Sequence, residues 1–387
     1  MRITRVQLRS SHRGEDLTAR LGDFECCYQL PPGAVANPSG DAFLAAGLLA
    51  AMALGEPLEL DPAFTASPTL LDGLARIQEV FAVWVPELKR VPVIARPAPP
   101  PPARSGAASF FSGGVDGLYT FLEKETDIAR VVHIRGFDYR RENHPLAEEI
   151  DRRNRAFVEG RGRPLTIVES NLRELYDALR IHVFIYHGSH LASVALATGF
   201  ECVYVPASFT WAGLLPWGSH PVTDPLWGNG AVRLVQHGLE VGRVDKLRRI
   251  GREAEALALL RVCPGFRDYS CGVCEKCLRT RVALRLLGLR SPNLPPLGSA
   301  LSVLRLRVNS ERSRVNWAEN HKLARETGDR ALAWVLGLAL ARYDVRRALR
   351  SVDDALLGGL ARSAWRGLKR LLGHPPSAPE LRIDTTG

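Results

Sequence analysis

The sequence predicts an α/β protein built on a parallel sheet, and three observations lead to this fold class. From Ala107 onward, short apolar segments alternate with helical segments across short turns, which is typical of a parallel sheet covered on both faces by helices. Dense proline precedes this region, and strand signals vanish beyond about Pro296. We therefore predict an N-terminal α+β domain, a proline-rich linker, an α/β domain and a C-terminal helical region, bounded as residues 1–95, 96–105, 106–295 and 296–387.

The N-terminal region is expected to combine strands with two helices. MRITRVQL and FECCYQL are strand-like, whereas Asp41 to Leu54 and Pro68 to Val80 are helical. After them comes VPVIARPAPPPPARSG, with five prolines between Pro97 and Pro102. Proline this dense forms neither a helix nor an interior strand, so the stretch indicates a stiff connector.

The α/β region supplies five strand candidates. They are Ala107–Phe111, Arg130–Ile134, Pro164–Val168, Glu201–Val205 and Val232–Gln236. Helices are expected between them at Val115–Lys124, at about Pro145–Phe157 and at Leu191–Thr198, the last one ending at Gly199. Ligands of such sheets bind at the carboxyl ends of the strands, so the loops after the strands are the places to look for a site.

The C-terminal region shows helical spacing only. Ala324 to Leu340 and Val345 to Leu372 are predicted to be amphipathic helices, with Trp317, Trp334 and Trp365 spaced along the region. We expect a helical appendage outside the α/β fold.

Composition and charge limit the function classes. The 387-residue chain has a formal charge of +10, most of it in residues 301–387, and a solvated basic face explains this better than nucleic-acid binding, which stays an alternative.

Its longest apolar run, Ala42 to Leu54, is shorter than the roughly 20 residues of a membrane span, and no apolar signal core follows Met1. The expectation is a cytoplasmic protein without membrane contact; a homodimer is left open.

The segment FFSGGVDG, from Phe110 to Gly117, follows the first strand of the α/β region. Glycines let successive backbone N–H groups face an anion, and the helix that follows adds its unpaired amides and its positive dipole end. Ser112 can donate to a phosphate oxygen. Asp116 would repel bare phosphate, so its presence indicates Mg²⁺ or a catalytic contact. The alternative, a structural turn, is weakened by the position after this strand.

Phe111-Ser112-Gly113-Gly114-Val115-Asp116 resembles the SGGxDS loop of the PP-loop ATP pyrophosphatases. The resemblance implies a Rossmann-like sheet of the adenine nucleotide alpha hydrolase type, with ATP phosphates held at Ser112, Gly113, Gly114, Val115, Asp116 and Gly117. The chain departs from this pattern at Gly117, where the family has serine. The lost hydroxyl donor is worth roughly 1.5–3 kcal/mol to a charged acceptor.

Four of the seven cysteines follow the spacing C-x7-C-x2-C-x2-C, at Cys263, Cys271, Cys274 and Cys277. Thiolates at this spacing can close a tetrahedron around Zn²⁺, and with no open position that zinc would be structural. A [4Fe–4S] cluster and plain burial are the alternatives. The other three cysteines are most simply buried thiols.

The loop and the cysteines together, with Leu-Arg after the last cysteine, resemble the 7-cyano-7-deazaguanine synthase family over roughly Ala107 to Leu289, about half of the chain. In that family the cysteines bind zinc, and the enzyme adenylates a carboxylate, adds ammonia and dehydrates the amide to a nitrile. Residues 1–105 and the helical tail lie outside the resemblance, so it does not settle the reaction.

Other candidates follow the later strands. Backbone at Ile134, Arg135 and Gly136 could contact the adenine in a PP-loop fold, or form only a turn. Ser189 is predicted at or near a helix N-cap, where it would meet nucleotide between His187 and His190, two substrate candidates. For all of these, a structural role is the competing interpretation.

Two further segments complete the predicted site. The loop PASFTWAGLLPWGSHPVTDPLWGNG offers Trp217, His220 and Asp224 for substrate binding, the last two also for catalysis. VGRVDKLRRI offers Lys246 as a catalytic charge beside phosphates, with Arg243 as a weaker candidate. Arg279, after the last cysteine, is a further substrate candidate. A packing loop and a charged surface helix are the respective alternatives.

The resemblance implies an ATP-dependent ligase. A small carboxylic acid would attack the α-phosphate of Mg²⁺-bound ATP, pyrophosphate would leave, and ammonia or an amine would displace AMP to form an amide. One alternative is a sulfur transferase that acts on RNA or a small molecule. Another is a nucleotide-binding protein whose catalysis has been lost through Gly117.

Overall fold

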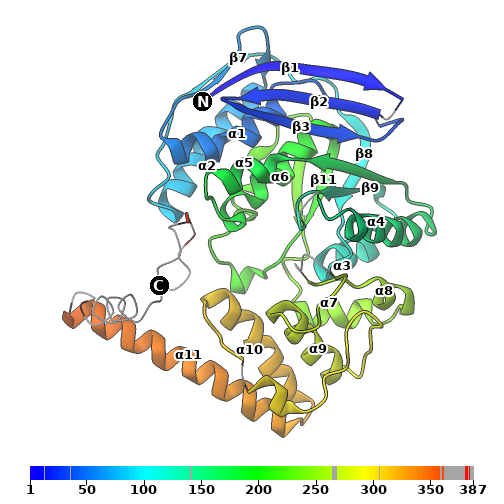
Figure 1. Ribbon diagram of the computed structural model, residues 1–387, viewed down its shortest axis with the longest axis vertical. Coiled ribbons are helices and arrows are strands. Elements are labelled where there is room, and N and C mark those ends of the chain that lie inside the picture. Colours follow the sequence, from blue (N-terminus) through cyan, green and yellow to red (C-terminus); the bar gives the residue numbers. More distant parts are fainter. Residues whose placement is uncertain are drawn as a thin grey trace.

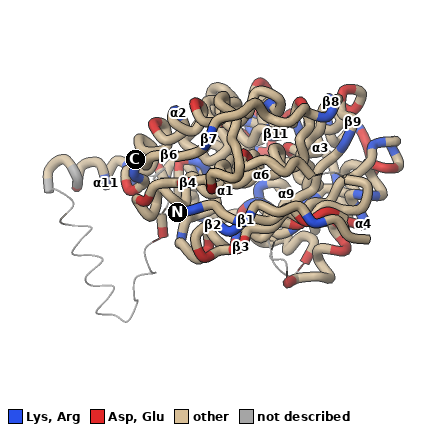
Figure 2. The backbone as a smooth tube through the Cα atoms, turned by 90° about the horizontal axis from the view of Figure 1, so that it is seen from above, with Lys and Arg blue, Asp and Glu red and all other residues tan. Residues whose placement is uncertain are grey.

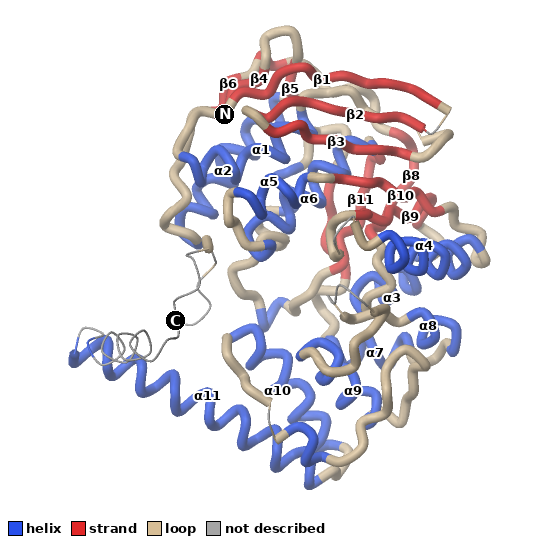
Figure 3. The backbone as a smooth tube through the Cα atoms, viewed as in Figure 1, coloured by secondary structure: helices blue, strands red, loops and turns tan. Residues whose placement is uncertain are grey.

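The computed structural model describes the whole chain except residues 13, 35, 140–141, 264–267, 305, 358–359, 361–379, 382 and 384–387. Its centre is a ten-stranded sheet with the order β12-β11-β8-β9-β10-β3-β2-β1-β4-β6 (Figures 1 and 3). The mostly parallel α/β sheet predicted from the sequence is confirmed.

The parallel half of the sheet holds the five predicted strands. They are β8 (Arg104–Phe110), β9 (Ile128–Arg135), β10 (Leu165–Ser170), β11 (Phe200–Pro206) and β12 (Arg233–His237). All four neighbouring pairs among them are parallel. Counted along the chain, the spatial order is 3-2-1-4-5, so the order reverses between β8 and β11. In doubly wound sheets such a switch point opens the ligand crevice.

The N-terminal strands extend the same sheet. β1 (Arg2–Ser11), β2 (Gly14–Leu21) and β3 (Phe24–Leu30) form an antiparallel meander, followed by the short strands β4 (Leu58–Leu60) and β6 (Val93–Ile94). β3 pairs antiparallel with β10. β5 (Thr65–Ala66) and β7 (Arg96–Pro97) make a separate two-stranded sheet. The predicted boundary at residues 95–106 therefore falls within continuous structure, and the division into domains stays a prediction.

One face of the sheet is covered by α1 (Asp41–Leu54), α2 (Pro68–Trp84), α5 (Leu172–Ala178) and α6 (Val183–Thr198), which share an apolar core with β8, β9 and β11. α1 follows its predicted range because DAFLAAGLLAAMAL is apolar nearly all round, as a helix buried inside a core must be. α2 begins with proline at the first helical position, where the missing N–H costs nothing.

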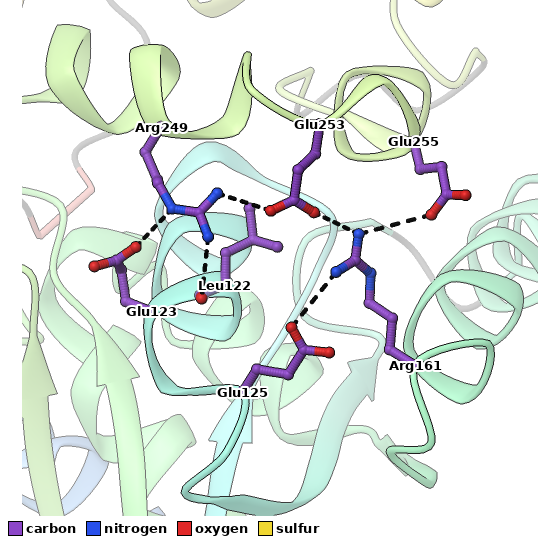
Figure 4. Close-up of polar contacts among 7 residues, drawn as sticks. All are labelled: Leu122, Glu123, Glu125, Arg161, Arg249, Glu253 and Glu255. Carbon is purple, nitrogen blue, oxygen red and sulfur yellow. Dashed lines mark hydrogen bonds and ion pairs between the residues drawn. The ribbon is translucent and has the colours of Figure 1, made fainter.

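The other face is covered by α3 (Val115–Lys124), α4 (His144–Glu159), α7 (Arg243–Ile250), α8 (Ala254–Leu259) and α9 (Glu275–Leu286), around a second apolar core. Six charged residues join α3, the end of α4, α7 and α8 (Figure 4). We call them the paired arginine cluster: Arg161, Arg249, Glu123, Glu125, Glu253 and Glu255.

Both guanidinium groups of this cluster pair with carboxylates, and Nε of Arg161 is the one guanidinium nitrogen of the two that has no partner among the described residues. Arg249 donates to Glu123 at 2.7 Å, to Glu253 at 2.8 Å and to the carbonyl oxygen of Leu122 at 3.3 Å. Arg161 contacts Glu125 at 3.4 Å and also pairs with Glu253. The cluster fixes α7 against α3, and both of these helices contribute side chains to the site described below.

The C-terminal region is helical, as predicted, but its helices have other bounds. α10 spans Glu311–Glu326 and α11 spans Arg330–Leu357. Ser310 caps α10 by accepting from the amide of Ser313 at 3.2 Å. No helix breaker interrupts 341–344, so α11 continues where a gap was predicted. The later part of the predicted 345–372 helix, with Trp365, lies outside the described residues.

The charged residues are spread over the molecule, with basic and acidic segments interspersed along the tube in Figure 2. Among the described helices, none combines the length and the apolar character that a membrane crossing requires.

Candidate functional site

The loop between β8 and α3 has the backbone of an anion-binding turn. Gly113 has φ +73°, a conformation that favours glycine, and a Cβ there would lie 3.1 Å from Oδ1 of Asn154. Gly114 is the N-cap of α3, and no side chain caps this helix end. The first helical hydrogen bond of the turn runs from the amide of Leu118 to the carbonyl oxygen of Gly114 at 2.8 Å. The amides of the first turn are therefore available to a ligand.

This loop opens into a cavity of about 410 Å³, within the range of roughly 300–1,000 Å³ for small-molecule sites. Phe110, Ile134 and Pro206 line it from the carboxyl ends of β8, β9 and β11, so the cavity lies at the switch point of the sheet. Many predicted residues line it: Ser112, Gly114, Val115, Asp116, Gly117, Ile134, His187, Trp217, Arg243, Cys263 and Arg279.

Asp116 is held by two cations from α7. Its Oδ2 accepts from Nη1 of Arg243 at 3.2 Å, and its Oδ1 from Nζ of Lys246 at 3.3 Å. Burial alone would raise the pKa of Asp116, but the positive charges of Lys246 and Arg243 outweigh burial and lower it. The carboxylate is therefore ionised at neutral pH and fixes Arg243 at the cavity wall.

Lys246 does not line the cavity, which corrects its predicted contact with phosphates. Its side chain is 2% exposed, and Nζ also donates to the carbonyl oxygen of Ala207 at 2.6 Å. The ammonium group lies behind Asp116, so it positions that carboxylate. Arg243, the weaker candidate from the sequence, is the α7 cation that reaches the cavity.

Three other arginines bring donors without hydrogen-bond partners to the cavity, and we call them the unpaired arginine cluster: Arg261, Arg279 and Arg312. Among the described residues, no hydrogen-bond partner exists for buried Nε and Nη2 of Arg261, Nε and Nη2 of Arg312, or Nε of Arg279. Burial, reinforced by the charge of Arg243, lowers the pKa of Arg279 to about 9. Buried donors without acceptors are costly, so this cluster is suited to an anionic ligand.

Arg312 is enclosed by aromatic rings. Its guanidinium carbon lies 3.4 Å from the ring centre of Phe184 and 4.0 Å from that of Trp217. Burial lowers the pKa of Arg312 to about 9, although the charge of Glu275 acts in the opposite direction. The two rings meet edge to face at 62°, and both pack against the guanidinium group. The residue comes from α10, which the sequence analysis had placed outside the site.

Five further charged residues of the cavity lining were missed by the sequence analysis: Asp138, Arg261, Glu275, Lys276 and Arg312. Burial alone would raise the pKa of Asp138, but Arg261 and Lys276 together lower it, so it is an anion among cations. A local signal existed only for Asp138, which follows β9 in the segment HIRGFD. The cations are brought in by tertiary contacts, including a backbone bond from the amide of Arg261 to the carbonyl oxygen of Gly113 at 2.8 Å.

His187 lies in the cavity wall, whereas Ser189 and His190 do not, which corrects two predictions. α6 begins at Val183 and is capped by His182, so Ser189 is inside the helix and not at its N-cap. Its hydroxyl donates to the carbonyl oxygen of Ala45 at 2.8 Å. Nε2 of His190 bonds the hydroxyl of Ser170 at 3.0 Å. Ser189 and His190 are core residues that join α6 to its neighbours.

His220 and Asp224 also lie outside the cavity lining, so the structure does not bring these two predicted site residues to the cavity. Asp224 is buried and accepts from Ser219 at 2.7 Å, from Gln236 at 2.7 Å and from the amide of His220 at 3.1 Å. Burial raises its pKa to about 6. The ring of His220 packs on Trp84 at 5.0 Å. Together they anchor the loop that presents Trp217.

Of the backbone predicted to meet adenine, only Ile134 lines the cavity. Arg135 pairs with Asp151 and, at 3.6 Å, with Glu169. Gly136 has φ +91° and forms the turn after β9. Arg135 and Gly136 thus have structural roles at the end of β9, and their predicted backbone contact with adenine stays a prediction.

The four predicted cysteines meet in one cluster, with all Sγ atoms within 4.8 Å of one another. Sγ atoms lie 3.8 Å apart for Cys263 and Cys274 and 3.9 Å apart for Cys271 and Cys277. Four thiolates at the zinc–sulfur distance of about 2.3 Å form a tetrahedron with edges of about 3.8 Å. The donor set fits a single metal ion; an iron–sulfur cube, which holds eight atoms, would need wider spacing. Cys263 also lines the cavity.

Comparison of the chain with protein-family models, with curated proteins and with solved structures finds no match.

Proposed function

We propose that the chain is an ATP-dependent ligase of PP-loop type, which adenylates a small carboxylic acid and transfers its acyl group to ammonia or an amine. One observation carries the proposal: the Ser112–Gly117 loop opens, with the uncapped end of α3, into a cavity bordered by buried arginine donors. A polyphosphate would supply acceptors for these groups.

The proposed reaction needs no protein nucleophile. The amides of the first turn of α3 and Arg243 would hold the β- and γ-phosphates while a carboxylate oxygen attacks the α-phosphorus. Pyrophosphate leaves, and the nitrogen nucleophile then displaces AMP from the acyl carbon. Positioning and charge neutralisation by fixed donors supply most of the acceleration in reactions of this kind.

Mg²⁺ would come with the nucleotide, because this ion is usually held by substrate phosphates and one or two carboxylates. Asp116 and Asp138 are the aspartates that line the cavity among the described residues. Both oxygens of Asp116 already accept from cations, so Asp138 is the freer ligand. Zn²⁺ belongs to the proposal as a structural ion held by the four cysteines.

The cysteines favour ligation over sulfur transfer. Within the described part of the chain, Cys263 alone among the cysteines lines the cavity, and it belongs to the proposed metal set. A sulfur carrier would need a thiol outside that set. Cytoplasmic location and a homodimer stay predictions.

The test is pyrophosphate release from Mg²⁺-ATP by metal-replete protein with a panel of carboxylic acids, alongside calorimetric titration of the nucleotide. Acid-dependent release with bound nucleotide is expected. A Cβ at Gly117 would make only ordinary contacts, 3.6 Å from the amide nitrogen of Ser112, so Gly117→Ser should fold and raise ATP affinity or rate. Failure to bind magnesium nucleotide would reject the proposal. Binding without turnover, even in Gly117→Ser, would favour a nucleotide-binding protein.

A further inference from the structure

The helix α11 has two apolar faces, and the described residues cover only one of them. The inner face is buried in an apolar core that also includes Trp317 of α10. Six residues of α11 belong to this core: Leu332, Val335, Leu336, Ala339, Leu340 and Tyr343. From 344 to 352 every residue of the helix is exposed, and this part extends past α10 at the edge of the molecule (Figure 1). The helix is therefore anchored along its first half, and its second half is open to a partner.

The outer face carries apolar side chains that we call the outer stripe of α11: Trp334, Leu338, Val345, Leu349, Val352 and Leu356. Five of these residues are between 53% and 77% exposed, and Leu338 is half-buried. Steps of four, three and four residues from Val345 to Leu356 keep the side chains on one side of the helix. The same steps are typical of the seam between two paired helices. Single exposed apolar residues are normal, whereas a contiguous patch marks an interaction site.

A row of arginines runs along one side of the outer stripe. Arg342, Arg346 and Arg350 follow one another at four-residue intervals, so they lie above one another on the helix surface. None of the three has a carboxylate partner within the described part of the chain. The guanidinium group of Arg346 donates to two carbonyl oxygens, that of Arg342 at 3.1 Å and that of Val308 at 3.0 Å. The row therefore offers positive charge to whatever covers the stripe.

Charge distinguishes the possible occupants of the outer stripe. The acidic residues near the row are already in use, since Asp344 pairs with Arg314 at 2.7 Å and Asp353 is buried with an interaction of its own. Two copies of α11 in antiparallel pairing would bring their arginine rows to the same side of the seam. In parallel pairing, Arg342 would meet its own counterpart at the seam. Like charges that face each other oppose association, so a second copy is a poor occupant and an acidic partner fits.

We propose that the outer stripe of α11 docks an amphipathic helix of another protein, with carboxylates along the edge of that helix that meets the arginine row. The two helices would pair as a short coiled coil. Because α11 packs on α10, which supplies Arg312 to the cavity, the partner would be held on the helix pair that borders the candidate site. This assignment does not depend on the proposed ligase activity.

The experiment measures the binding of two fluorescein-labelled peptides to full-length, metal-replete protein by fluorescence anisotropy. Both peptides are helices of about three heptads with leucine at the two seam positions. One peptide carries glutamate at every flanking position, and the other carries lysine there. The protein should bind the glutamate peptide at least tenfold more tightly than the lysine peptide, and high salt should narrow this difference.

Variants of α11 locate the binding surface. Leu349→Asp should weaken binding of the glutamate peptide at least tenfold, because it places a charge in the middle of the outer stripe. Arg342→Glu/Arg350→Glu should reverse the preference in favour of the lysine peptide. Val83→Asp is the matched control, because Val83 on α2 is 79% exposed and lies outside the stripe, and it should change neither affinity. Thermal melting checks that every variant is folded.

Four results would overturn the assignment: binding of neither peptide, equal binding of both, no loss in Leu349→Asp, or the same loss in Val83→Asp. Sedimentation velocity tests the second copy as occupant. A dimer of the wild-type protein that Leu349→Asp dissociates would assign the stripe to self-association and would also overturn the proposal. None of these results bears on pyrophosphate release, so the docking surface and the proposed function can fail separately.

Discussion

The paired and unpaired arginine clusters lie in the same half of the molecule but treat their charges in opposite ways. Arg249 directs all three of its guanidinium nitrogens to acceptors. Arg161 pairs with Glu125 and Glu253 and leaves only its Nε without a partner. In contrast, Arg261 and Arg312 keep two donors each without a partner, and Arg279 keeps one. Folding alone does not favour buried cations that repel one another. The difference indicates that the first cluster holds helices together and the second is kept for a ligand.

The largest effect should come from removing the metal. Cys263 and Cys277 are close in sequence to Arg261 and Arg279, so a metal ion bound by the four cysteines would hold two residues of the unpaired arginine cluster in place. Metal binding by four thiolates contributes on the order of 10 kcal/mol. We expect one zinc per chain by elemental analysis, and loss of both zinc and nucleotide binding in Cys274→Ser. Cys202→Ala, in β11, is the control; iron with labile sulfide would contradict this prediction.

Asp116→Asn should destabilise the ligand-free protein by about 3 kcal/mol, because it leaves the buried Lys246 and Arg243 without their carboxylate. Chemical denaturation measures the free energy of unfolding. Asp245→Asn, an exposed aspartate on α7, should change it little. A loss below about 1 kcal/mol, the scale of exposed pairs, would show that Asp116 does not hold these cations.

The stability of the fold should fall in mild acid through two histidines. Burial lowers the pKa of His187 to about 4 and that of His190 to about 3, from the ordinary 6.5. Between the folded-state pKa values and pH 6.5, these two histidines bind more protons in the unfolded chain than in the folded protein. Their contribution to the free energy of unfolding is therefore complete above pH 6.5 and is lost as the pH falls. Denaturation from pH 7 to 4.5 should show a shallower decline in His187→Asn/His190→Asn.

Arg279→Met should stabilise the ligand-free protein by about 1–2 kcal/mol, because it removes a buried unpartnered donor and a charge beside Arg243. It should also weaken nucleotide or acid binding, as a trade between stability and function predicts. Thermal melting and calorimetry measure the two effects. Destabilisation instead would mean that the fold itself needs this cation.

Arg249→Gln should have the smallest effect on the free energy of unfolding. Unlike Arg279→Met, it should lower this free energy. The partly exposed pairs with Glu123 and Glu253 are worth up to about 1 kcal/mol, and high salt should reduce the difference. Nucleotide binding should not change. A large loss of binding would show that the two clusters are coupled through α7.

Local patterns in the sequence predicted much of the scaffold. α1 and α3 follow their predicted ranges, and all five parallel strands lie within a few residues of theirs. The glycine loop opens into the cavity and the four cysteines meet in one cluster; both features depend on near neighbours in the chain.

The failures have more than one cause. The segment HVFIYHGSH is rich in aromatic and β-branched residues, so its helix was placed too late and Ser189 was put at a cap. Asp224 was taken for a site residue although two of its three donors, Ser219 and the amide of His220, lie within five residues of it in the chain. Arg312 was missed because its aromatic partners come from segments about a hundred residues earlier.

The contact between β3 and β10 has a consequence for synthesis on the ribosome. The amide of Cys27 bonds the side chain of Asn171, 144 residues further along the chain. While the intervening chain is being made, the outer edge of the first hairpins has no neighbour, and unpaired strand edges are prone to aggregate. The β1–β3 meander lacks its β10 partner until residue 170 has been synthesised. We therefore expect the nascent chain to depend on chaperones until about that residue has left the exit tunnel.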